Sequence, residues 1–150
     1  MKTLIIMPTF NESESLETTV SSLRAVNSNV HLLIVDDNSP DGTGEIADSL
    51  RDEKIFVLHR DSKQGLGAAY LEGFAWALSR DYEIVVEMDA DGSHRAQDLQ
   101  ELLNAVEQAD LVIGSRWVHG GSVLNWPWYR KAISKFGNLY AKTLLRTNIN

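Results

Sequence analysis

The sequence alternates short apolar, β-rich runs with segments of helical periodicity, and this alternation restricts the possible folds more than any other feature. Five runs are predicted strands: Thr3–Met7, His31–Val35, Ile55–Leu58, Ile84–Met88 and Leu111–Ile113. A helix is predicted after each of the first four strands and another at the end of the chain. The first, second and fourth helices are recognised by their apolar positions: Leu16, Val20 and Leu23; Ile46, Ala47 and Leu50; and Leu99, Leu102, Leu103 and Val106. The third and the last are predicted over Gly67–Leu78 and Tyr129–Leu145. This order favours an α/β fold with a mostly parallel sheet and helices on both faces.

Two details of the helices are predicted from local signals. Asn11, followed by Glu14 three residues later, resembles a capped start of the first helix. The segment Gly65–Tyr70 matches a dinucleotide fingerprint only weakly, since Tyr70 stands at the third small position, and a flexible helix entry is the better interpretation. The third helix is expected to face the core with Leu71, Phe74, Ala75 and Leu78.

Acidic residues follow three of the predicted strands. Asp36 and Asp37 come after the second strand, Asp61 after the third, and Asp89 and Asp91 after the fourth. Ligands of open α/β sheets bind at the carboxyl ends of the strands, so these clusters are expected to converge on one edge. Because like charges repel, that edge needs a compensating cation or a ligand rich in hydrogen-bond donors.

The segment Asp89-Ala90-Asp91 is the sharpest candidate site. Its two carboxylates can bind Mg²⁺ or Mn²⁺ through oxygen ligands, and such a cation would neutralise a departing diphosphate. The alternative is two solvated acids in a loop, and the strand-end position favours the metal site. His94 could join the metal, although a lone histidine beside two aspartates is more often a local hydrogen-bonding residue.

Two interpretations of Asp36-Asp37 remain open on spacing alone. A carboxylate there can accept hydrogen bonds from ring N–H groups or ribose hydroxyls of a nucleotide. It can equally cap the turn-forming segment Asn38–Gly42, a role that Asp41 could also fill.

The formal net charge of −7 hides a division within the chain. All 21 acidic side chains and eight of the basic ones lie in residues 1–115, a balance of −13, whereas residues 116–150 carry +6 and no acid. Arg116, Arg130 and Lys131 are candidates for phosphate binding. Three tryptophans of the basic part also suit a membrane–water interface: Trp117, Trp126 and Trp128.

Composition excludes several classes of protein. The absence of cysteine excludes a disulfide scaffold, a Cys-ligated zinc site and a thiol nucleophile. The acidic balance argues against non-specific nucleic-acid binding. The first apolar run is too short for a signal peptide or a membrane helix, so a cytoplasmic chain is predicted.

Read in order, these segments resemble the dolichol-phosphate and polyprenol-phosphate mannosyltransferases of glycosyltransferase family 2, with a GT-A fold. The resemblance rests on an ordered set of motifs: Pro8–Glu12, Val35–Thr43, Gly65–Tyr70, Met88–His94, Gly114–Trp117, Gly120-Gly121 and Asn125–Arg130. It implies a Rossmann-like nucleotide-sugar-binding domain and transfer of mannose from GDP-mannose to a polyprenyl (dolichyl) monophosphate, with inversion at the anomeric carbon.

The resemblance also implies roles for individual residues. Those of the nucleotide-sugar site would be Pro8, Phe10, Glu12, Val35, Asp37, Asp89, Ala90, Asp91 and Arg116. Asp89, Asp91 and Ser93 would hold the divalent cation, Mg²⁺ or Mn²⁺. Arg116 and Arg130 would hold phosphate groups and, with the two aspartates, form the catalytic set. Phe10 stands where the family often has Tyr, and Ser93 where some members have Gln.

The resemblance divides the chain into a nucleotide-sugar part, 1–115, and an acceptor-phosphate and membrane-facing part, 116–150. Family members continue with an acidic D-x-T-x-G-aromatic-Arg segment, further strands and acceptor-binding helices. A chain ending at Asn150 is thus expected to be a C-terminally truncated domain, peripheral on the cytoplasmic face of the membrane. It is expected to fold poorly or to rely on a partner, for which a membrane protein is one candidate. It is also expected to bind nucleotide weakly and to turn over little lipid.

Three alternatives stay open at this point. One is a related transferase that uses UDP-glucose or another sugar nucleotide. The second is a metal-dependent nucleotidyltransferase, against which the sequence lacks a basic, Gly-rich first loop. The third is a non-catalytic nucleotide-sugar-binding module.

Overall fold

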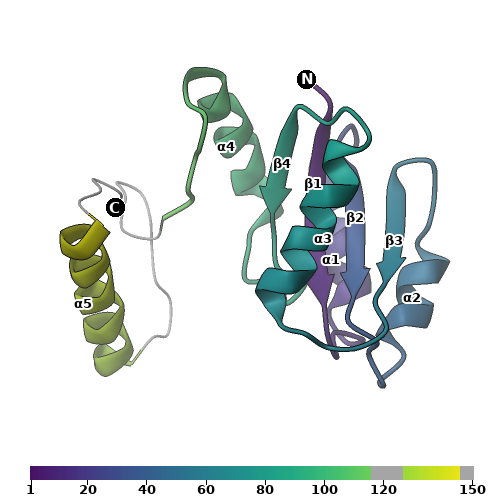
Figure 1. Cartoon of the computed structure of the whole chain (residues 1–150), viewed down its shortest axis with the longest axis horizontal. Helices are drawn as coiled ribbons and strands as arrows, with labels where there is room; N and C mark the ends of the chain where they lie inside the picture. Colours follow the sequence, from purple (N-terminus) through teal and green to yellow (C-terminus); the bar gives the residue numbers. More distant parts are fainter. Residues whose placement is uncertain (116–126, 146–150) are drawn as a thin grey trace. The chain divides into compact units, whose positions relative to one another are not determined.

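The computed structural model describes residues 1–115 and 127–145 of the chain (Figure 1). The chain divides into two compact units, Met1–Gln100 and Glu101–Asn150. Among the described residues, no helix combines the length and the apolar character that crossing a bilayer requires.

The first unit is built on a sheet of four parallel strands in the order β3-β2-β1-β4. The strands are β1 (Thr3–Thr9), β2 (His31–Asp36), β3 (Ile55–His59) and β4 (Ile84–Glu87), which confirms four of the predicted strands. Their apolar runs are continuous because both faces are covered, as expected for a parallel sheet. The α/β prediction is therefore confirmed.

Helices cover both faces of the sheet, α3 on one and α1 and α2 on the other (Figure 1). Helix α1 (Leu16–Val26) buries Leu16, Val20 and Leu23 as predicted, and α2 (Thr43–Ser49) buries Ala47. The predicted helix start at Asn11 is wrong, because Asn11 adopts a left-handed φ of 61° and α1 begins only after Ser15. Hydrogen bonds to the loop after β2 hold residues 11–13 instead.

Helix α3 (Leu66–Leu78) packs on the sheet through a different face from the predicted one. Its buried residues are Ala69, Tyr70, Gly73 and Ala77, whereas Leu71 is 69% and Leu78 81% exposed and Ala75 is exposed too. Of the predicted core positions, only Phe74 packs partly against the core. The reason is the close approach of the helix to β1: a Cβ on Gly73 would lie 2.6 Å from Cγ2 of Ile6, so a larger side chain cannot stand at that point of contact.

Beyond β4 the chain forms short helices and no further strand in the part that the structure describes. These are η1 (Ala96–Asp98), α4 (Leu99–Ala105) and η2 (Val106–Gln108). The predicted strand Leu111–Ile113 is wrong: it has no sheet partner, and Leu111 is 72% and Ile113 52% exposed. The last predicted helix is confirmed as α5 (Trp128–Leu145).

The strand order determines where a ligand can bind. The chain runs from β1 through β2 to β3 and then returns to the other side of β1 with β4. In open α/β sheets, a reversal of this kind marks the usual ligand position, outside the carboxyl ends of the strands on either side of it, here β1 and β4. The loops after β1, β2 and β4 all begin at that edge.

Candidate functional site

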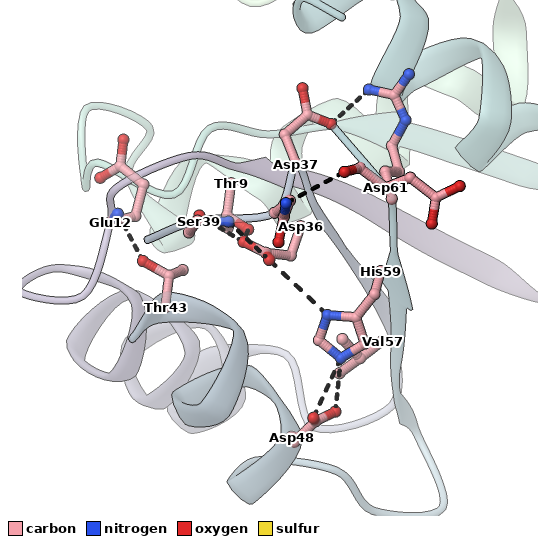
Figure 2. A network of polar contacts seen from close by, with 12 residues as sticks. Thr9, Glu12, Asp36, Asp37, Ser39, Thr43, Asp48, Val57, His59 and Asp61 are labelled. Carbon is pink, nitrogen blue, oxygen red and sulfur yellow. Dashed lines mark hydrogen bonds and ion pairs between the residues drawn. The ribbon is translucent and has the colours of Figure 1, made fainter. Parts of the chain in front are cut away.

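Asp36 connects the ends of the three strands β1, β2 and β3. The parallel register places it opposite Thr9 on one side and His59 on the other. Its buried carboxylate accepts hydrogen bonds from Thr9 Oγ1 at 3.1 Å and from the amide and hydroxyl of Ser39 at 3.2 and 2.6 Å (Figure 2). With its oxygens used in this way, Asp36 shapes the loop, which is the turn-capping role considered for the pair.

The loop after β1 is bound to the loop after β2 through its backbone amides. The Asn11, Glu12 and Ser13 amides donate to Ser39 Oγ, Thr43 Oγ1 and Asp41 Oδ2 at 3.1, 2.9 and 3.1 Å, respectively. Asp41 also accepts hydrogen bonds from the amide and hydroxyl of Thr43, as considered from the sequence. The Thr43 hydroxyl does most to hold the pKa of Asp41 well below its usual range, with Ser13 contributing.

Asp37 differs from Asp36 because its carboxylate pairs with a buried arginine. Asp37 Oδ1 accepts a hydrogen bond from Arg60 Nη1, and Arg60 Nε donates to Glu72 Oε1 on α3 at 2.9 Å. The Asp37 amide donates to the Thr9 carbonyl at 3.0 Å, which fixes the backbone beside the end of β1. Arg60 thereby supplies part of the compensating positive charge that the acidic edge was expected to require.

Asp89 and Asp91 lie in the loop after β4. The Met88 amide donates to the Ile6 carbonyl at 3.1 Å, so the ladder with β1 continues up to this loop. The Ala90 carbonyl accepts from Thr19 Oγ1 on α1 at 2.9 Å in a buried contact. This anchor leaves Asp91 exposed and the Asp89 side chain 42% exposed, both accessible to a ligand.

The environment of Asp91 favours its charged form. Partial burial raises the pKa of Asp91, but the amide and hydroxyl of Ser93, with His94 nearby, outweigh it, so this pKa lies below its ordinary value. Asp89 lies 3.4 Å from the hydroxyl of Tyr70, whose pKa is raised by burial and by the negative charges of Asp89 and Glu87. Asp91 is thus a permanent anion near neutral pH.

His94 acts as a local hydrogen-bonding residue, as favoured from the sequence. Its Nδ1 accepts from the Asp89 amide at 3.1 Å, and its Nε2 lies 3.8 Å from Asp89 Oδ2. The described residues contain no group of three or more histidine, aspartate and glutamate side chains able to hold a metal ion. A cation bound here would need ligands beyond the carboxylates of Asp89 and Asp91.

The other nucleotide-site residues differ in what they present to solvent. Pro8 is half-buried in β1, opposite Val35. The side chain of Val35 is fully buried in the core under α3, so only the Val35 backbone can contact a ligand. Phe10 is half-buried, and Lys63 Nζ lies 3.6 Å from its ring centroid. Glu12 accepts a hydrogen bond from Ser15 Oγ at 2.7 Å, beside the start of α1.

The basic candidates and the tryptophans belong to the second unit, and some lie outside the described residues. Arg116, Trp117 and Trp126 lie outside the described residues. Arg130 is exposed on α5, in the second unit, and Trp128 at the start of α5 is 80% exposed.

Sequence reasoning missed Arg60, Tyr70 and Thr19 as parts of the site. A signal for Arg60 was available, because it is a lone cation between His59 and Asp61 at the end of β3, next to an edge rich in acids. The contacts of Tyr70 and Thr19 carried no local signal, since their partners lie 19 and 71 positions away in the sequence.

The fold is a parallel α/β sheet with an acidic edge at the carboxyl ends of its strands, and comparison with known proteins identifies the family. The model of glycosyl transferase family 2 matches residues 4–149. The chain belongs to this family, as the resemblance implied.

Curated relatives carry more specific names. The chain is 52% identical over 153 residues to the polyprenol monophosphomannose synthase of Mycolicibacterium smegmatis, covering 99% of this chain and 58% of that protein. It is 52% identical over 151 residues to the undecaprenyl-phosphate mannosyltransferase of Micrococcus luteus, covering 99% and 62%. It is 41% identical to the dolichol-phosphate mannosyltransferase of Pyrococcus furiosus, covering 90% and 39%. The chain therefore spans about three fifths of the first two relatives.

Solved structures show the same fold at low sequence identity. A mannosyltransferase from Pyrobaculum calidifontis, in complex with GDP-Man and Mn²⁺, matches with a TM-score of 0.60 and 23% identity over 70% of this chain and 32% of that one. S. aureus TarS in complex with UDP matches with a TM-score of 0.60 and 21% identity over 72% and 32%. These likenesses support the GT-A type of fold.

Proposed function

We propose that this chain is the nucleotide-sugar-binding part of an inverting mannosyltransferase. The reaction moves mannose from GDP-mannose to a polyprenyl (dolichyl) monophosphate and yields polyprenyl-phosphate mannose and GDP. The observation that carries the proposal is the 52% identity, over 99% of the chain, to two proteins named for this lipid chemistry. The acidic edge at the carboxyl ends of β1, β2 and β4 supports it, since it fits a ligand that is rich in hydroxyl and N–H donors and arrives with a cation.

The donor set at Asp89 and Asp91 fits a hard divalent cation. Carboxylate and hydroxyl oxygens are the ligands that Mg²⁺ and Mn²⁺ take, and Mg²⁺ sites commonly combine one or two carboxylates with substrate phosphates and water. We assign Asp89 and Asp91, with Ser93 beside them, as the residues that would hold it. When bound, the cation would offset the negative charge of the departing diphosphate.

The remaining residues would bind and orient the substrates. An acceptor phosphate is already an anion at neutral pH, so the chain needs no strong general base. Arg116 and Arg130 would hold phosphate groups and align the attacking oxygen behind the anomeric carbon. Pro8, Phe10, Glu12, Val35, Asp37 and Ala90 complete the proposed nucleotide-sugar site.

We further propose that residues 116–150 face the acceptor phosphate and a membrane surface. Helix α5 supports this, because it contains cations and no acid and exposes large apolar side chains. The exposed ones are Trp128, Tyr129, Ile133, Phe136, Leu139, Tyr140 and Leu144. A basic amphipathic helix with aromatic residues is typical of peripheral binding to anionic membranes.

Calorimetric titration of GDP-mannose and UDP-glucose, each with and without Mg²⁺, tests the proposed donor. GDP-mannose is expected to bind at least about tenfold more tightly than UDP-glucose, which corresponds to one or two hydrogen bonds to the base. Its binding is expected to weaken when Mg²⁺ is removed. Equal or tighter binding of UDP-glucose would instead favour the transferase for another sugar nucleotide.

A further inference from the structure

Arg60 is a buried cation whose contacts are incomplete. Its side chain is 2% exposed, and two of its nitrogens are used, Nη1 by Asp37 and Nε by Glu72. Nη2 is buried and has no hydrogen-bond partner among the described residues. A buried charge is costly unless it is paired, so Arg60 depends on both carboxylates for its position.

The pairing with Arg60 gives the two carboxylate oxygens of Asp37 different surroundings. Oδ1 faces the guanidinium, whereas Oδ2 accepts no hydrogen bond from the described residues and points away from the network (Figure 2). The backbone of Asp37 is also held, through its amide on the Thr9 carbonyl and through the Arg60 amide on the Asp36 carbonyl at 2.8 Å. Side chain and backbone together thus hold the second oxygen in a defined direction, in a side chain that is 6% exposed.

Such an oxygen can distinguish nucleobases. Guanine presents a ring N–H and an adjacent amino group, both donors that suit a carboxylate. Adenine presents an unprotonated ring nitrogen on the corresponding edge, which a carboxylate repels. The discrimination requires that the carboxylate cannot rotate to meet a different donor pattern.

We propose that Arg60, held by Glu72, is a positioning residue that fixes the Asp37 carboxylate for a base carrying a ring N–H, and so sets the base preference of the site. This inference rests on the proposed function, because it takes the ligand to be a guanosine diphosphate derivative. The planar guanidinium is needed, since it donates to Asp37 and Glu72 in two fixed directions. Lysine offers only a flexible point charge.

The test compares the affinities of GDP, IDP and ADP, which share ribose and diphosphate, for the 150-residue chain with Mn²⁺ present. IDP keeps the ring N–H of GDP and lacks its amino group. In the wild type the expected order is GDP, then IDP, then ADP. In Arg60→Lys, which keeps the charge, GDP affinity is expected to fall about tenfold while ADP affinity stays unchanged.

Two further variants separate positioning from folding. Glu72→Ala removes a side chain that is 49% exposed, so the fold should persist, and the GDP-to-ADP preference is expected to fall by a smaller factor than in Arg60→Lys. Arg24→Lys is the matched control. Arg24 also donates to an aspartate, Asp52, but lies at the amino ends of the strands, and its replacement should leave all three affinities unchanged.

The outcomes are distinguishable. Three results would overturn the role of Arg60 and leave the proposed function standing. They are a wild-type GDP-to-ADP preference in Arg60→Lys, an equal loss of affinity for all three nucleotides in Arg60→Lys, and an unchanged preference in Glu72→Ala. A wild type that binds no nucleoside diphosphate, or that shows no preference for GDP, would overturn the proposed function and this inference together.

Discussion

Neighbouring acids at the edge of this sheet have different roles, and the difference lies in their partners. Asp36 is buried, and its carboxylate holds Thr9 and Ser39, so its charge is used inside the protein. Asp91 is exposed and receives hydrogen bonds from Ser93 within its own loop, so its charge remains available to a ligand. Predictions at the scale of single residues follow from this division.

Asp91→Asn is expected to weaken Mn²⁺ binding by at least about 100-fold, because an amide oxygen replaces one of only two candidate carboxylates. The Asn oxygen can still accept the Ser93 amide, so the thermal midpoint should change little. Titration followed by the Mn²⁺ paramagnetic resonance signal measures the affinity. Asp98→Asn, outside the loop, is the control, and unchanged Mn²⁺ affinity in Asp91→Asn would contradict the metal assignment.

Asp41 is expected to make the fold sensitive to acid. Its folded-state pKa lies below the unfolded value of about 3.9, so its stabilising contribution is complete above that value and is lost as the pH falls toward the folded pKa. Asp41→Asn should therefore lower the free energy of unfolding near pH 7 and flatten its decline below about pH 4. Urea unfolding over a pH series measures both effects. A profile that merely runs parallel to the wild type would refute the prediction.

At the scale of elements, the packing of α3 on β1 depends on the absence of a side chain. Gly73→Ala would place a Cβ 2.6 Å from Ile6 Cγ2 and is expected to cost about 1–3 kcal/mol of unfolding free energy. The cost should be smaller in an Ile6→Ala background, so a double-mutant cycle should show coupling. Gly67→Ala on the same helix is the control, because a Cβ there meets nothing within 4 Å. Strict additivity in the cycle would contradict this packing.

For the whole molecule, the separation of charge predicts a dependence on salt and lipid. The balance of −13 in residues 1–115 should repel an anionic surface, and the +6 of residues 116–150 should attract it. Binding to vesicles containing anionic lipid is therefore expected to exceed binding to neutral vesicles and to fall as salt rises. Co-sedimentation measures the bound fraction at each lipid composition.

Paired charge removals locate the binding surface. Lys131→Gln with Lys135→Gln on α5 should weaken vesicle binding about tenfold or more, since each basic residue near the surface contributes about 1 kcal/mol. Arg51→Gln with Lys54→Gln removes the same charge from the first unit, near the start of β3, and should have little effect. Equal losses in both pairs would refute the assignment of α5 as the membrane-binding element.

The order of strands and helices was predictable because it depends on local periodicity. The apolar runs of β1 to β4 and the buried face of α1 follow from nearest-neighbour patterns that any window of the chain displays. The position of Asp37, Asp89 and Asp91 at the same edge of the sheet was predictable for a similar reason, since parallel strands end at a common edge. The run 111–113 failed as a strand because strand formation needs a partner, which no local pattern contains.

By itself, the sequence determined the parallel α/β architecture, the acidic edge and the division of charge, since each depends on the order of residue types along the chain. Only the tertiary structure decided which face of α3 enters the core, because the close approach to Ile6 excludes leucine there. It also decided that Asp36 serves the fold while Asp37 meets Arg60. Those roles depend on partners brought together from different strands. Because a buried polar group is costly without a well-placed partner, each pairing depends on geometry as well as on charge.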